Sequence, residues 1–133
     1  MLYLLQYKYL KAIECDSPIY SCFALGIFDT LDKVNEAIEY YRIQKGFSEH
    51  KNAFQLTFLD VSAIDKSVYM ASYSHIGDRY CDDKDIVFDV CETYDLAKEV
   101  IDEWKTCFNG FLDEDFIIDK WIINELEWKN GFH

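Results

Sequence analysis

The chain of 133 residues carries a formal net charge of −12, and 50% of its residues are hydrophobic against one proline and five glycines. This composition excludes a disordered chain, and the length allows one domain with a buried core. No apolar run reaches the roughly 20 residues that a membrane helix needs, and the acidic charge opposes binding to nucleic acid or anionic lipid. We therefore expect a single compact domain over residues 1–133 that binds neither nucleic acid nor membrane.

The first half of the chain, residues 1–65, reads as two strands, a helix and a third strand. Apolar and polar residues alternate in the stretches expected to be strands, which are residues 2–10, 20–28 and 54–58. In the second of these strands the alternation places Phe23, Leu25 and Ile27 on one face. The second half, residues 66–133, repeats this β-β-α-β order and adds a C-terminal tail.

The helix is the feature that the chain contains twice. Its apolar positions recur 63 residues later with the same spacing and form one stripe in each copy: Leu31, Val34, Ala37, Ile38 and Tyr41, then Tyr94, Ala97, Val100, Ile101 and Trp104. Each copy begins at residues whose side-chain oxygens suit a helix N-cap, Asp29 or Thr30 and Glu92 or Thr93. Each ends at a glycine followed by a phenylalanine, with the glycines at Gly46 and Gly110. This long period with matching helix ends indicates an internal duplication.

Two such units in one chain predict an α+β fold. One helix covers only one face of three strands, so each unit alone would leave apolar surface in water. Joining the tandem β-β-α-β repeats edge to edge gives a mostly antiparallel sheet of about six strands with both helices packed on one side. In the alternative, the two half-sheets stack face to face. The tyrosines of the first strands would then lie between the sheets or line a groove on the helix-free face.

Motifs in both halves resemble a family of small bacterial domains of unknown function. In the first half the matching segments are Tyr3-Leu-Leu-Gln6, Gly26-Ile-Phe-Asp-Thr30, Ala37-Ile38 and Gly46-Phe47. In the second half they are Thr93, Ala97, Ile101, Gly110-Phe111 and Phe116-Ile-Ile-Asp-Lys-Trp121. Members of that family are usually a single copy, so the resemblance implies a homodimer joined into one chain, a monomeric pseudo-dimer. It implies no catalytic residue, because the family has none assigned.

The negative charge is concentrated in the second half of the chain. Residues 1–66 hold nine acidic and seven basic residues, whereas residues 67–133 hold sixteen and six. A field of this sign speeds encounter with a basic protein, although acidity also serves solubility. The predicted partner-binding residues are the carboxylates of the second helix and its adjacent loops: Asp78, Asp82, Asp83, Asp85, Asp95, Glu99, Asp102, Glu103, Asp113, Glu114 and Asp115.

A stripe of tyrosines offers an alternative binding face, formed by Tyr3, Tyr7, Tyr9, Tyr69 and Tyr73. Aromatic residues on a sheet under a helix usually belong to the core. If they instead face an uncovered side, they make an amphipathic surface of the kind enriched at interfaces. The sequence leaves both arrangements open.

No pattern in the sequence indicates catalysis, a metal or a cofactor. The three histidines, His50, His75 and His133, have no second ligand at helical spacing. The chain has no glycine-rich phosphate loop and no nucleophile elbow. Its five cysteines include no C-x-x-C pair, and as small hydrophobic residues they suit a reducing compartment, which predicts a cytoplasmic protein.

These observations favour a non-enzymatic acidic protein that neutralises a protein partner. An immunity protein against a bacterial toxin fits best, because carboxylates can block the substrate cleft of a basic nuclease. An inhibitor of another basic nucleic-acid-acting protein would use the same electrostatics. The alternative function is a small-ligand sensor or an enzyme with a tyrosine-lined cavity between the two repeats.

Overall fold

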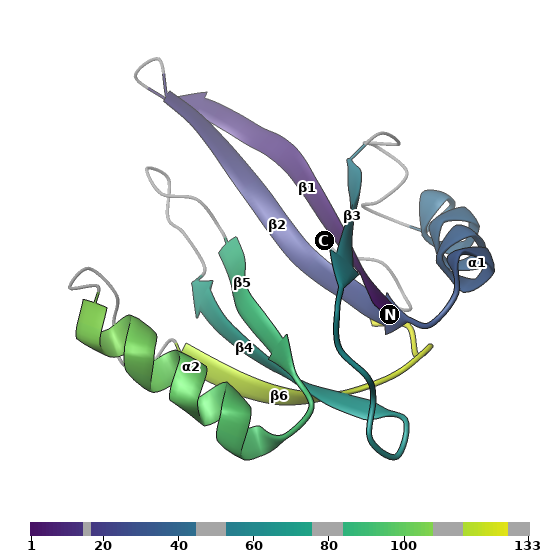
Figure 1. Ribbon diagram of the computed structural model, residues 1–133. Coiled ribbons are helices and arrows are strands. Elements are labelled where there is room, and N and C mark those ends of the chain that lie inside the picture. Colours follow the sequence, from purple (N-terminus) through teal and green to yellow (C-terminus); the bar gives the residue numbers. More distant parts are fainter. Residues whose placement is uncertain (15–16, 45–52, 76–83, 108–115, 128–133) are drawn as a thin grey trace.

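The computed structural model describes residues 1–14, 17–44, 53–75, 84–107 and 116–127. In these ranges the chain forms, in order, β1 (Leu2–Glu14), β2 (Ser17–Phe28), α1 (Leu31–Arg42), β3 (Phe54–Leu59), β4 (Ser67–His75), β5 (Lys84–Cys91), α2 (Tyr94–Cys107) and β6 (Phe116–Ile122). The strands make two three-stranded antiparallel sheets, ordered β2-β1-β3 and β5-β4-β6 (Figure 1). The fold is therefore α+β, as predicted, and the first strand of each half is the centre of its sheet.

Each sheet packs one face against its own helix and the other face against the second sheet. The cluster under α1 is built from Leu5, Tyr7, Leu25, Phe28, Val34, Ala37 and Tyr41. The cluster between the sheets is built from Leu2, Leu4, Ala24, Ile27, Val68, Met70 and Val90. The cluster under α2 is built from Ala71, Cys91, Ala97 and Ile101. The order of layers is thus helix, sheet, sheet, helix, and Figure 1 shows α1 and α2 on opposite outer sides.

This stacking corrects the prediction of one sheet of about six strands with both helices on one side. The described strands form two separate sheets, as in the stacked alternative. The physical reason is that each sheet has a second apolar face that no helix covers. Edge-to-edge pairing would leave that face in water, whereas stacking buries Leu4 and Met70 to 2% exposure each.

A β-bulge lies at the same place in both halves. In the first sheet Leu5 pairs with Gly26 and Gln6 pairs with Ala24, so Leu25 is the extra residue. In the second sheet the register shifts between Ala71 and Ser72 in the same way. Because one inserted residue reverses the alternation of faces, Leu25 lies under α1 while Ile27 lies between the sheets. The prediction that Phe23, Leu25 and Ile27 share a face is wrong for this reason.

A threonine caps the N-terminus of each helix. The Thr30 Oγ1 atom accepts a hydrogen bond from the Lys33 N–H at 3.2 Å, and the Thr93 Oγ1 atom accepts one from the Leu96 N–H at 3.3 Å. The prediction left open whether the acidic residue or the threonine caps each helix, and the geometry selects the threonine. The predicted terminal glycines, Gly46 and Gly110, lie outside the described residues. Neither described helix is long and apolar enough to cross a membrane.

The segment after β6 crosses back to the first half of the chain. The Asn124 N–H donates to the Ile27 carbonyl at 2.8 Å, and the Glu127 N–H donates to the Leu25 carbonyl at 3.0 Å. Leu126 packs into the cluster under α1. This stretch of the tail, for which the sequence predicted no structure, therefore runs along the edge of β2 and joins the two halves.

Candidate functional site

The structure describes four of the predicted partner-binding carboxylates in full, and all four are exposed on α2. Asp95, Glu99, Asp102 and Glu103 form what we call the acidic face. The side chain of Asp85 on β5 is not described. The loop carboxylates lie outside the described residues; these are Asp78, Asp82, Asp83, Asp113, Glu114 and Asp115.

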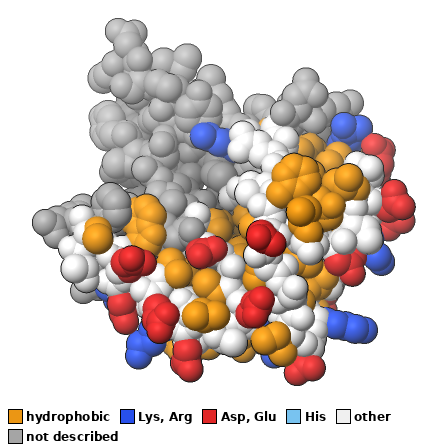
Figure 2. Space-filling view, viewed as in Figure 1, with side chains coloured by type: hydrophobic (Ala, Val, Ile, Leu, Met, Phe, Trp, Pro, Cys, Tyr) orange, Lys and Arg blue, Asp and Glu red, His pale blue; other side chains and the backbone are white. Residues whose placement is uncertain are grey.

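The acidic face points away from the sheet because of helical periodicity. Ala97 and Ile101 are buried against the second sheet. At about 100° per residue, the four carboxylates fall on the opposite side of the helix. Figure 2 shows acidic and hydrophobic side chains interspersed over the lower part of the molecule, where Figure 1 places α2. Tyr94 and Leu96 add apolar surface there, with exposures of 51% and 46%.

The acidic face is not neutralised within the described part of the chain. None of its four carboxylates lies in a salt bridge among these residues. The Lys105 Nζ atom lies 5.4 Å from the centroid of the Phe116 ring, so this cation packs on β6. Lys98 is the one other cation in the α2 sequence. The face therefore presents a net negative field to solvent.

The corresponding face of α1 is more nearly balanced. Asp32, Glu36 and Glu39 stand where Asp95, Glu99 and Asp102 stand in α2. However, the Glu39 carboxylate forms a salt bridge with Arg42 at 3.0 Å. In addition, Lys33 and Tyr40 occupy the positions of Leu96 and Glu103. The two helices share a core stripe but differ in the charge that they present.

The tyrosine stripe lies on the helix-covered faces of the sheets. Tyr7 and Tyr73 are buried, with exposures of 0% and 6%, and Tyr3 and Tyr69 are partly buried. Their rings make edge-to-face contacts with Phe54, Phe116, Phe58 and Tyr94, respectively. The side chain of Tyr9 is not described. The four described tyrosines thus pack beneath or beside the helices and not between the sheets.

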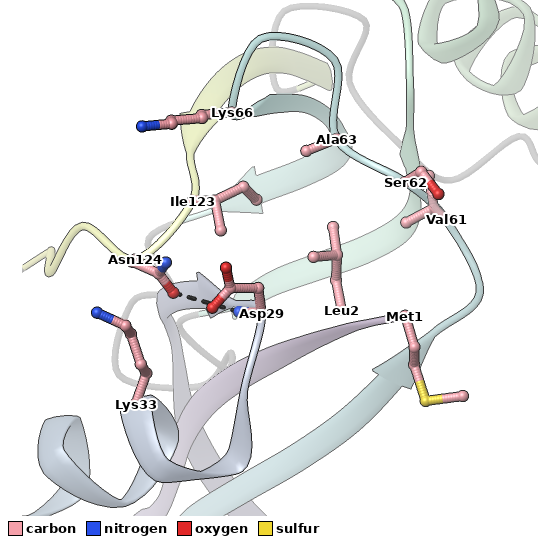
Figure 3. Close-up of a pocket in the computed structure, with 10 residues that line it drawn as sticks. All are labelled: Met1, Leu2, Asp29, Lys33, Val61, Ser62, Ala63, Lys66, Ile123 and Asn124. Atoms are coloured by element: carbon pink, nitrogen blue, oxygen red, sulfur yellow. Dashed lines mark hydrogen bonds between the residues drawn. The ribbon is translucent and has the colours of Figure 1, made fainter.

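A cleft lies where the two halves meet, and the sequence analysis did not anticipate it. Its volume is about 650 Å³, and we call it the junction cleft; its lining residues are Met1, Leu2, Asp29, Lys33, Val61, Ser62, Ala63, Lys66, Ile123 and Asn124 (Figure 3). None of the tyrosines whose side chains the structure describes lines it. Sequence reasoning had no signal for this site, because its walls come from four separate segments that only the tertiary fold brings together.

The described residues offer little nucleophilic or metal-binding chemistry. Burial raises the pKa of the Cys91 thiol, and the nearby Asp89 carboxylate raises it further, so this cysteine is protonated at neutral pH. Cys107 is exposed at the end of α2. Within the described ranges no three His, Cys, Asp or Glu side chains lie together in a group that could hold a metal ion.

Comparison with known proteins gives no relative from which a function could be transferred. The chain matches no protein-family model, and neither a curated protein nor a solved structure matches it significantly.

Proposed function

We propose that this chain is a non-enzymatic binding protein that neutralises a basic protein partner through the acidic face of α2. The observation that carries the proposal is the set of carboxylates Asp95, Glu99, Asp102 and Glu103, which are all exposed on one side of α2 and form no salt bridge with another described residue. Exposed Leu96 beside them supplies apolar contact area. An acidic field with apolar surface beside it suits a cationic protein surface, because charge speeds the encounter and buried area holds the complex.

The most specific form of the proposal is an immunity protein against a bacterial toxin. A nuclease toxin must bind nucleic acid and so carries a basic substrate cleft, which acidic residues can occupy. The net charge of −12 supports a protein partner over nucleic acid or an anionic membrane. We place this function in the cytoplasm, where a toxin of this kind would act.

We also propose that the chain arose by duplication of one β-β-α-β unit and acts as a monomeric pseudo-dimer. Three features support this: the strand order is the same in both sheets, the bulges fall at equivalent positions, and a threonine caps each helix. The resemblance to single-copy bacterial domains of unknown function agrees with such an origin. After duplication the acidic surface evolved on one copy only.

The neighbouring gene and charge reversals on the two helices together test the proposed function. We expect a toxin-like domain to be encoded directly upstream, and its inactivated form supplies the partner. Reversing Asp102 and Glu103 to lysine should slow association about tenfold or more at low salt, and the difference should shrink as salt rises. The fold should survive, because exposed helix positions rarely cost more than about 0.5 kcal/mol.

The control is the reversal of Glu36 and Glu39 to lysine on α1, which makes the same change in net charge. Association rates are measured by stopped-flow fluorescence for both variants across a salt series. If both pairs of substitutions slow association equally, or if salt has no effect, the acidic face is only a solubility feature. A metabolic operon around the gene, with no basic protein retained by the purified chain, would also contradict the proposal.

A further inference from the structure

We propose that the junction cleft binds a small amphipathic organic anion, with a carboxylate or phosphate head and a compact apolar body. This inference is independent of the proposed function, because the cleft and the acidic face use different residues. The segments that follow the last strand of each half, which contain Val61 and Ile123, both line the cleft. The start of β1 and the residues just before and within α1 complete the walls.

Two lysines give the cleft a cationic end in a strongly acidic protein. Lys33 and Lys66 are exposed, and among the described residues neither forms an ion pair. Figure 3 shows both ammonium groups extending on the same side of the cleft, with Asn124 and Asp29 between them. Among the side chains that line the cleft, Asp29 contributes one negative charge against the two lysines. An anionic head group would complement the two ammonium groups.

The backbone at Lys66 is a second observation that points to the same end of the cleft. Asp65 and Lys66 form the tight turn between Ile64 and Ser67, and both have positive φ angles, 53° and 61°. Turns of this kind favour Asn-Gly, because a side chain in the left-handed region costs about 1 kcal/mol. The chain nevertheless places lysine, and not glycine, at this position, which lines the cleft. The turn therefore fixes the backbone from which the Lys66 side chain leaves at the rim of the cleft.

The opposite end of the cleft is apolar. Leu2 belongs to the cluster between the two sheets, and Val61, Ala63 and Ile123 pack against that cluster, so the cleft opens onto the inter-sheet core. Figure 3 shows Leu2 and Val61 on the side away from the two ammonium groups. A volume of about 650 Å³ is typical of sites for small organic ligands. The lining thus has one polar end and one apolar end, which is the pattern that an amphipathic ligand requires.

Binding of simple probes to the intact chain tests this inference. Hexanoate and phenyl phosphate serve as anionic probes, and hexanol serves as the neutral match to hexanoate. We expect both anions to shift the methyl NMR signals of Leu2, Val61 and Ile123 in a saturable way below about 10 mM, with hexanol binding at least about fivefold more weakly than hexanoate. Lys33→Gln combined with Lys66→Gln should weaken hexanoate binding about tenfold and bring it to the level of hexanol.

The matched control is Lys98→Gln combined with Lys120→Gln, which removes the same charge from exposed positions on α2 and β6 outside the cleft. It should leave hexanoate binding within about twofold of the original. Lys66→Gly gives a separate readout, because it relieves the positive φ angle: the melting temperature should rise while hexanoate binding weakens. The inference is overturned if no probe gives saturable shifts, if hexanol binds as well as hexanoate, or if both lysine pairs have the same effect.

Discussion

At the scale of single residues, Tyr41 shows how one side chain joins the two halves of the chain. It lies on α1 with 0% exposure. Its hydroxyl donates to the Leu25 carbonyl on β2 at 3.1 Å and also to the carbonyl of Glu127 in the tail. Burial raises the pKa of Tyr41, and the charge of Glu127 and the neighbouring Tyr40 add to the effect. The neutral phenol is therefore the form that the folded state holds.

Replacing Tyr41 with phenylalanine should lower the free energy of unfolding by about 1–2 kcal/mol, because the Leu25 and Glu127 carbonyls lose their shared donor. The raised pKa also sets a pH dependence. The folded state keeps a proton that the unfolded state releases above about pH 10, so the original chain loses stability as pH rises beyond that value. Urea unfolding at about pH 8 and about pH 11 should show this loss, with a smaller loss in Tyr41→Phe.

Tyr94→Phe is the control for this prediction, because Tyr94 is 51% exposed. It should change the free energy of unfolding by less than about 0.5 kcal/mol. Equal losses in the two variants would show that the Tyr41 hydroxyl does not hold the tail against α1.

At the scale of single elements, the two helices have the same design and differ only in what they present to solvent. Each begins at a threonine whose side chain accepts from the third following N–H, and each buries a stripe against its own sheet. The caps, as one of two residues for each helix, and most of each stripe were predicted from local sequence, but the first residue of each predicted stripe, Leu31 and Tyr94, is exposed to 48% and 51%. The charge difference between α1 and α2 was also predicted, since an exposed residue keeps its charge whatever the packing beneath.

Removing either N-cap should cost about 1 kcal/mol of stability, because the first helical amides lose their acceptor. We expect Thr30→Ala and Thr93→Ala to lower the urea midpoint by similar amounts, with little change in its slope. Thr30→Ser and Thr93→Ser retain the hydroxyl and should recover most of the loss. A serine variant as unstable as its alanine counterpart would mean that the threonine methyl group matters, and not the cap.

At the scale of the whole molecule, the core between the sheets makes each half depend on the other. Leu2, Leu4 and Ile27 from the first sheet meet Val68, Met70 and Val90 from the second. An isolated half would expose this face to water, which costs about 25 cal/mol of free energy per Å² of apolar surface. The first half would also lose the tail, which bonds to β2 and places Leu126 under α1.

Neither half should therefore fold alone. We expect fragments 1–66 and 67–133, prepared separately, to lack cooperative thermal unfolding and a near-ultraviolet circular dichroism signal. Mixed in equal amounts, they should form a one-to-one complex that regains both. A monomeric fragment that unfolds cooperatively by itself would contradict this prediction and would show that one unit covers its own apolar faces.

The features that the sequence did not predict all depend on contacts between segments that are distant along the chain. The bulge between Leu5 and Gln6 reverses the alternation of β2, and residue type alone does not show where an extra residue enters a ladder. Edge-to-edge pairing and face-to-face stacking both satisfy the same alternating pattern, so the pattern could not decide between them. The junction cleft draws on four segments that are distant along the chain. Only the packed arrangement defines it.

The sequence by itself determined the β-β-α-β order, the buried part of each helix stripe, two candidate caps for each helix, and the exposed acidic residues of α2. These follow from periodicities and capping preferences that act over a few neighbouring residues. The tertiary structure alone decided that the sheets stack, that the tyrosines lie on the helix-covered faces, and that the tail returns to β2. Each of these three features depends on which apolar face of a sheet packs against a helix and which packs against the other sheet. The whole chain decides this arrangement, because the favoured packing leaves the least apolar surface in water.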